Sequence, residues 1–143
     1  MDFTAYDSRA AAETGRDLQL KHPVTGDLMF DGDKPCMVNV IGSESREAQA
    51  AIRAVQKAKT KSEKDEEQNI ENLHKLLVQT ATPLVKGFKN IDRGDKPAKA
   101  PDDVDWLLNL QLINGQDGEE SFVEQIAKFA TRRANFLGNG SKG

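Results

Sequence analysis

Apolar and polar residues alternate in the first third of the chain. The alternation is clear in residues 18–21, and a second apolar run covers residues 37–41. A period of two is typical of a half-buried strand. Residues 23–26 and 31–35 carry the Gly, Pro and Asp that form turns. The pattern in residues 1–42 therefore predicts a small antiparallel β-hairpin or sheet. Such an element needs a helix against one face to be stable.

A short helix is predicted ahead of these strands. Three alanines within residues 8–14 favour it. Asp7 or Ser8 can cap its first turn, and Gly15 can end it.

From residue 43 the apolar spacing changes to that of a helix. Ser43 is the expected N-cap, and Glu44 would lie in the first turn, where the helix dipole favours a carboxylate. Ser62 and Asp65 have the spacing of a second helix start, so we favour a break near Ser62. One continuous helix remains the alternative, because residues 60–69 contain no Gly or Pro. The face of the first helix carries Ala48, Ala51, Ile52 and Val55.

The clearest helical pattern comes after this break. Pro83 removes a backbone donor and should kink the helix near Gln79, and Gly87 should end it. Its apolar stripe consists of Ile70, Leu73, Leu77, Leu84 and Phe88, and most of these residues are three or four positions apart.

A linker and two C-terminal helices complete the prediction. Residues 92–101 contain two prolines and no periodicity, as expected of a linker. Asp102 should cap a short helix that contains Trp106. The last helix is predicted over residues 119–137, with an apolar face formed by Phe122, Ile126, Phe129 and Phe136.

These elements predict a single α+β domain over residues 1–143. The antiparallel β-element occupies residues 1–42, and a mainly α-helical body of about four helices comes after it. That body consists of central helices in residues 43–91, the linker in residues 92–101 and C-terminal helices in residues 102–143.

Composition limits the function classes. The net charge is −3, with 30% charged and 37% hydrophobic residues. A negative net charge disfavours general nucleic-acid binding, and a DNA-binding regulator is disfavoured for the same reason. The basic residues between Arg53 and Lys64 are interpreted as a solvated helix face.

Residues for catalysis or metal binding are sparse. Cys36, His22 and His74 are the complete set of Cys and His, which is fewer than the four ligands of a structural zinc site. Nothing in their spacing suggests a Cys–His nucleophilic pair. Residues 31–33 contain two aspartates, but the segment is too short to form a calcium-binding loop. We therefore expect no enzyme activity, no metal and no cofactor.

The expected compartment is the cytoplasm. One cysteine cannot form an internal disulfide, and no apolar run approaches the length of a membrane span. Residues 1–9 lack a hydrophobic signal region. We expect no membrane association.

The C-terminal helices supply a hypothesis for partner binding. The simplest interpretation of Trp106 and the phenylalanine stripe is a packed core. Two short helices beyond a linker could instead present apolar faces to another chain. In this hypothesis the two arginines bind acidic groups of the partner and the other six residues make apolar contact. The eight residues are Trp106, Phe122, Ile126, Phe129, Arg132, Arg133, Phe136 and Leu137.

Short motifs at both ends resemble a known family. They occur in the order DSRAAA at residues 7–12, LQL at 18–20, HPVTG at 22–26, IGS at 41–43, GFKN at 87–90 and RANFL at 133–137. Together they resemble the small tail assembly chaperones of long-tailed, siphovirus-like bacteriophages. The similarity is thin between Arg53 and Gln79. Phe88 stands where the family leads us to expect tryptophan, and the 92–101 segment is longer and more charged than expected.

The resemblance implies a non-enzymatic function. Such chaperones bind the phage tape-measure protein and keep it soluble in the cytoplasm of the infected bacterium. They are displaced as the major tail tube protein polymerises, and they are usually absent from the mature virion. The alternative within the phage context is a structural tail or head–tail connector component that stays in the virion. Weak self-association is a further expectation, because a spare apolar face can pair with a second copy.

Overall fold

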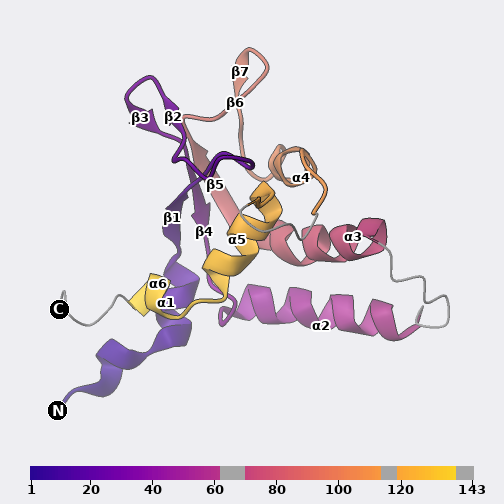
Figure 1. Cartoon of the computed structure of the whole chain (residues 1–143). Coiled ribbons are helices and arrows are strands. Elements are labelled where there is room, and N and C mark those ends of the chain that lie inside the picture. The colour runs from indigo at the N-terminus through magenta and orange to yellow at the C-terminus, as the bar shows by residue number, and fades with distance from the viewer. Residues whose placement is uncertain (62–69, 114–118, 138–143) are drawn as a thin grey trace.

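A three-stranded antiparallel sheet lies at the centre of the molecule. The computed structural model describes residues 1–61, 70–113 and 119–137. The strand order is β1 (Arg16–Gln19), β4 (Met37–Val40) and β5 (Val85–Lys89), so the last strand comes from far along the chain (Figure 1). Val38 of the central strand pairs with Leu18 on one side and with Phe88 on the other. Helices and antiparallel strands together confirm the α+β class.

The first predicted helix is confirmed. The 3₁₀ helix η1 (Phe3–Tyr6) leads into α1 (Ser8–Thr14). The Asp7 side chain accepts a hydrogen bond from the Ala10 N–H at 3.0 Å, which caps α1. Gly15 ends it with a φ of +82°, a conformation that glycine adopts without a Cβ clash.

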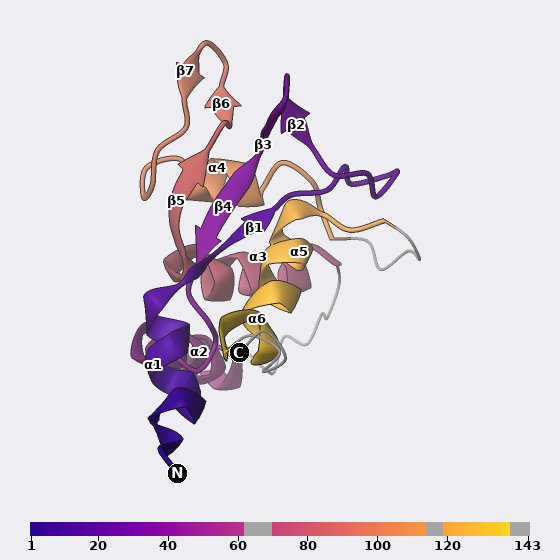
Figure 2. The same cartoon turned by 90° about the vertical axis from the view of Figure 1, so that its left-hand side faces the viewer.

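Two small hairpins extend from the same end of the sheet (Figures 1 and 2). One joins β2 (Phe30–Asp31) to β3 (Lys34–Pro35), where the sequence predicted a turn. The other joins β6 (Asp92–Arg93) to β7 (Lys96–Pro97). The prediction of an open linker over residues 92–101 was therefore wrong. Gly94 adopts a positive φ in the turn, and Ala98 is buried, so this segment is folded onto the body.

The central region contains two helices that lie side by side and antiparallel (Figure 1). They are α2 (Arg46–Lys61) and α3 (Ile70–Ala81), and the predicted break near Ser62 lies outside the described residues. The expected cap at Ser43 was wrong, because the Ser45 hydroxyl accepts the Ala48 N–H at 3.1 Å. The cap comes after Gly42 and Ser43, whose backbone N–H groups form hydrogen bonds with other parts of the chain.

The third predicted helix ends earlier than its apolar spacing indicated. Pro83 lies in the 3₁₀ turn η3 (Thr82–Leu84), and β5 begins directly after it. The kinked helix reaching Phe88 was therefore a wrong prediction. Phe88 keeps a four-residue step from Leu84 by coincidence, and strand pairing with β4 determines its conformation.

The last predicted helix is also interrupted. After α4 (Val104–Leu108) come α5 (Phe122–Ala130) and the short α6 (Ala134–Leu137), so residues 119–137 are not one helix. Ser121 and Glu124 form a reciprocal capping box at the start of α5. At its end, the Asn135 side-chain amide donates to the Phe129 carbonyl at 2.9 Å, which stabilises the turn into α6.

The hydrophobic core lies between the sheet and α3, α4 and α5. Figure 2 shows the sheet in front of α3 and α4, with α5 beside β1. Val38 and Val40 of β4 and Ile126 of α5 have no exposed area. The C-terminal helices are thus part of the main body, and they are not detached from it as the linker interpretation implied. Buried neighbours in the same cluster include Leu84, Val104, Leu107, Leu108, Phe122 and Val123.

Removal of the Ile126 side chain tests this core assignment. Ile126→Ala leaves a cavity at the sheet–helix contact, so the free energy of unfolding should fall by about 2–5 kcal/mol. Leu28→Ala is the control, because Leu28 is 51% exposed and its truncation should cost less than about 0.5 kcal/mol. Urea unfolding followed by circular dichroism measures both. Equal costs for the two variants would contradict the assignment.

Candidate partner-binding site

The predicted apolar contact stripe lies mainly inside the protein. Phe122, Ile126 and Phe136 are 6%, 0% and 2% exposed. In this fold a partner cannot reach them, so their predicted role in direct contact is replaced by a role in the core. The physical reason is that α5 covers the sheet, whose buried valines need an apolar partner.

The other apolar residues of the hypothesis are half-buried. Trp106 and Phe129 pack against the core, and Leu137 lies at the end of α6 with intermediate exposure. The Phe129 and Phe136 rings meet edge to face, with their centroids 5.5 Å apart. This contact holds α6 against α5.

The two arginines differ in their surroundings. Arg132 is exposed, and it takes part in none of the ion pairs found among the described residues. Arg133 donates from Nε and Nη2 to the two carboxylate oxygens of Glu44, at 3.1 and 2.8 Å. The acidic group that the hypothesis placed on a partner is therefore, for Arg133, supplied by the same chain.

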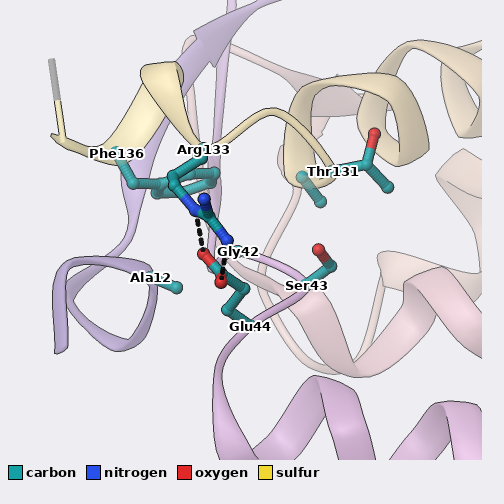
Figure 3. A pocket seen from close by; sticks show the side chains of 8 residues that line it. Ala12, Gly42, Ser43, Glu44, Thr131, Arg133 and Phe136 are labelled. Atoms are coloured by element: carbon teal, nitrogen blue, oxygen red, sulfur yellow. Dashed lines mark hydrogen bonds and ion pairs between the residues drawn. The ribbon is translucent and has the colours of Figure 1, made fainter. Parts of the chain in front are cut away.

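Arg133 and Glu44 lie in a cleft between the two ends of the chain (Figure 3). The cleft has a volume of about 340 Å³, and its other lining residues are Ala12, Gly42, Ser43, Ala130, Thr131 and Phe136. Residues from α1, α5, α6 and the loop before α2 thus meet at one place. Sequence reasoning found the arginine and the phenylalanine but missed Glu44 and Gly42 as their neighbours.

Close backbone approach builds this cleft. The Gly42 N–H donates to the Ala12 carbonyl at 2.9 Å, and the Ser43 N–H donates to the Ala130 carbonyl at 2.8 Å. A Cβ at position 42 would lie 2.8 Å from the Ala12 Cβ and 3.1 Å from the Phe136 ring. Glycine is therefore required here for space, and the loop links α1 to α5.

Electrostatics reinforce the same junction. The hydrogen bond from Arg133 lowers the pKa of Glu44 below its ordinary value, and the Glu44 carboxylate raises the pKa of Arg133. Arg16 donates from Nη2 to the Phe136 carbonyl at 2.9 Å, which ties α6 to β1. The cleft contains one mutually neutralised ion pair, and its arrangement suits structural closure better than chemistry.

The histidines and the cysteine are spread over different parts of the fold. His74 is buried in α3, where its Nε2 lies 2.9 Å from Asn109 Oδ1. The Cys36 thiol donates to the Asn90 carbonyl at 3.2 Å, and His22 Nδ1 accepts the Val24 N–H at 3.1 Å. The described part of the chain contains no group of three potential metal-ligating side chains.

A groove between α3 and α4, which has an exposed leucine on a largely polar wall, is a second candidate surface. Its volume is about 370 Å³. Leu112 is 50% exposed and lines the groove beside Val78, and the nearby Leu110 is 46% exposed. The charged and polar residues of its wall are Glu71, His74, Lys75, Gln79, Asp105 and Asn109.

The sequence carried a signal for this groove. Residues 106–113 have the sequence WLLNLQLI, which is rich in apolar residues. Helix α4 has only five residues and ends at Leu108, so one helix face cannot bury all of these side chains. Leu107 and Leu108 take the core positions, which leaves Leu110 and Leu112 outside. The spacing identified the helix, but only the packing shows which leucines remain free.

No protein-family model, curated protein or solved structure matches this chain. None of the helices in the described ranges combines the length and apolar character that a membrane crossing needs. The two candidate surfaces are therefore assessed from their own geometry.

Gly42 provides a direct test of the terminal junction. Gly42→Ala should lower the free energy of unfolding by about 1–3 kcal/mol, because the added methyl group collides with Ala12 and Phe136. Gly87→Ala is the matched control, since a Cβ there would find only the Asn39 Cβ within 4 Å, at 3.9 Å. Denaturant unfolding measures both variants. A Gly42 variant as stable as the Gly87 variant would contradict the close approach.

The Glu44–Arg133 ion pair predicts a pH dependence. The folded-state pKa of Glu44 lies below its ordinary value of 4.5, so its stabilising contribution is fully present above that value and is lost as the pH falls through the lowered folded-state pKa. Wild type should therefore melt at a higher temperature than Glu44→Gln at about pH 7, and the gap should shrink as the pH falls below the ordinary pKa of a glutamate. Differential scanning fluorimetry across this range measures the gap.

Asp33→Asn is the control for that titration. Asp33 is an exposed carboxyl outside the ion pairs of the described residues. Its variant should follow the wild-type melting temperature over the same pH range. A gap for Glu44→Gln that is independent of pH would show that Glu44 does not act through its charge.

Proposed function

We propose that the protein is a tail assembly chaperone of a long-tailed bacteriophage, which binds the tape-measure protein in the cytoplasm of the infected host. The observation that carries this proposal is the groove between α3 and α4, with the exposed Leu112 on its wall and Leu110 exposed nearby. The motif resemblance supplies the family, and the groove supplies a surface for a helical client. The proposed activity is binding, without catalysis or a cofactor.

The groove suits one stripe of an amphipathic helix. Leu112 offers apolar contact, while Val78 lines the groove but is only 6% exposed, and Glu71, Lys75 and Asp105 surround the groove with charge. A helix lying in such a groove buries residues spaced by three and four positions. A tape-measure protein is expected to be a long helical rod, whose exposed apolar stripe would aggregate unless it is covered.

Release is as important as binding in this function. A groove of about 370 Å³ gives each copy a small contact area. Many weakly bound copies along one rod would together keep it soluble, and each copy could still be displaced singly. The proposed displacing partner is the major tail tube protein as it polymerises.

Two of the motifs that carry the resemblance lie next to each other. Helix α1 contains most of the DSRAAA motif, and it packs on α6, which contains most of RANFL (Figures 1 and 2). Their contact through Gly42 and Phe136 gives both motifs a structural role in one junction. This arrangement leaves the α3–α4 groove on a different part of the surface.

Co-expression with the tape-measure protein of the same phage tests the proposal. Wild type should keep the tape-measure protein soluble and co-purify with it. The variant Leu110→Asp/Leu112→Asp places two charges at the groove, so it should fold but lose most of this binding. The control Leu28→Asp/Phe30→Asp changes two exposed apolar residues of the β2 region and should bind as wild type does.

Three outcomes would count against the proposal. Wild type that fails to solubilise the tape-measure protein would rule out the chaperone function. Equal loss in both double variants would rule out the groove as the site. Abundant protein in purified mature virions would favour the alternative, a structural tail or head–tail connector component. Sedimentation of the free protein tests the accompanying proposal of weak self-association.

A further inference from the structure

A second surface with a different chemistry lies beside the β6–β7 hairpin. A cleft of about 310 Å³ is lined by Arg93, Lys96, Pro97, Lys99 and Asp103. Three basic side chains and one carboxylate give it a net charge of +2, although the whole chain carries −3. The cleft shares no lining residue with the α3–α4 groove.

Hairpin geometry concentrates the positive charge on one side. Arg93 and Lys96 are direct cross-strand partners, so their side chains lie on the same face of the hairpin. Asp92 pairs with Pro97 at the next position, which places its carboxylate on the opposite face.

The single carboxylate of the cleft is already engaged. Asp103 Oδ1 accepts from Arg93 Nη1 at 2.9 Å, and Oδ2 accepts from the Lys99 backbone N–H at 2.8 Å. The Arg93 guanidinium also lies over the Trp106 ring, 5.3 Å from its centroid. Asp103 and Trp106 therefore position the arginine before any partner arrives.

The two lysines are available for binding. Lys96 and Lys99 are exposed, and neither belongs to an ion pair within the described ranges. The Arg93 side chain remains 52% exposed despite its contacts. A planar guanidinium and two ammonium groups around one small cleft match carboxylates on a flexible segment. The negative field of the rest of the protein repels any anion, and it repels a polyphosphate more than a segment of spaced carboxylates because the polyphosphate carries more charge per unit length.

We propose that this cleft docks an acidic segment of a protein partner, with Arg93, Lys96 and Lys99 binding its carboxylates. Pro97 forms a rigid wall beside the lysines. Because the contacts are exposed and ionic, the interaction should be weak and should decrease as salt is added. It would supply orientation and a faster association rate more than affinity.

A labelled peptide tests the site in the full-length protein. The probe is a fluorescein-labelled Glu-Ser repeat peptide, followed by fluorescence anisotropy at low salt, and a Gln-Ser repeat serves as the uncharged control. Lys96→Gln/Lys99→Gln should weaken binding of the Glu peptide by about fivefold or more. The charge-matched variant Lys21→Gln/Lys34→Gln changes two exposed lysines elsewhere and should stay within about twofold of wild type.

The proposal requires each of these results. It fails if wild type does not bind the Glu peptide, if the Gln peptide binds equally well, or if both lysine variants lose the same affinity. A single-stranded oligonucleotide of equal charge that binds as tightly as the Glu peptide would assign the cleft to phosphates and overturn the proposal. The lysines are exposed, so unchanged melting temperatures should accompany both variants.

Discussion

The structure depends on burial of one face of the central strand β4. Val38 and Val40 have no exposed area, and they lie between two flanking strands and beneath α5. Burial of apolar surface is the main favourable term in folding, and a three-stranded sheet cannot supply it alone. The chain therefore has to return twice to this strand, once as β5 and once as α5. These returns place the C-terminal helices in the core.

A second consequence is the closure of the two chain ends at Gly42. The loop after β4 must pass between α1 and α6, and only a residue without a side chain fits there. Arg133 and Glu44 add an ion pair across the same junction. The α3–α4 groove and the cleft at the β6–β7 hairpin share no lining residue with this junction.

Local signals in the sequence predicted much of this fold. Alternation located β1 and β4, and Asp7 and Gly15 marked both ends of α1, because these patterns depend on neighbouring residues. The position of β5 could not be predicted this way, since the strand is specified by pairing with β4 some 50 residues earlier in the chain. Pro83 was recognised as a disruption, but whether it kinks or ends a helix depends on how residues 85–89 pair in space.

The candidate site was less predictable than the fold. Phe129 and Phe136 were found by their spacing, yet spacing is the same for a core stripe and for a docking stripe. Their ring contact and the burial of Phe136 separate the two cases. Arg133 was expected to bind a partner's acid, and Glu44, 89 positions away, takes that place. Such a distant pairing leaves no mark in a single sequence.

Hydrogen–deuterium exchange of the protein with and without the proposed client, the tape-measure protein, would show directly whether the groove is the binding site. We expect new protection in residues 71–79 and 105–112, which border the groove, with unchanged exchange across α5. A loss of protection in α5 when the client binds would contradict this expectation. That result would mean that the buried stripe opens to the partner and that the groove is not the binding site.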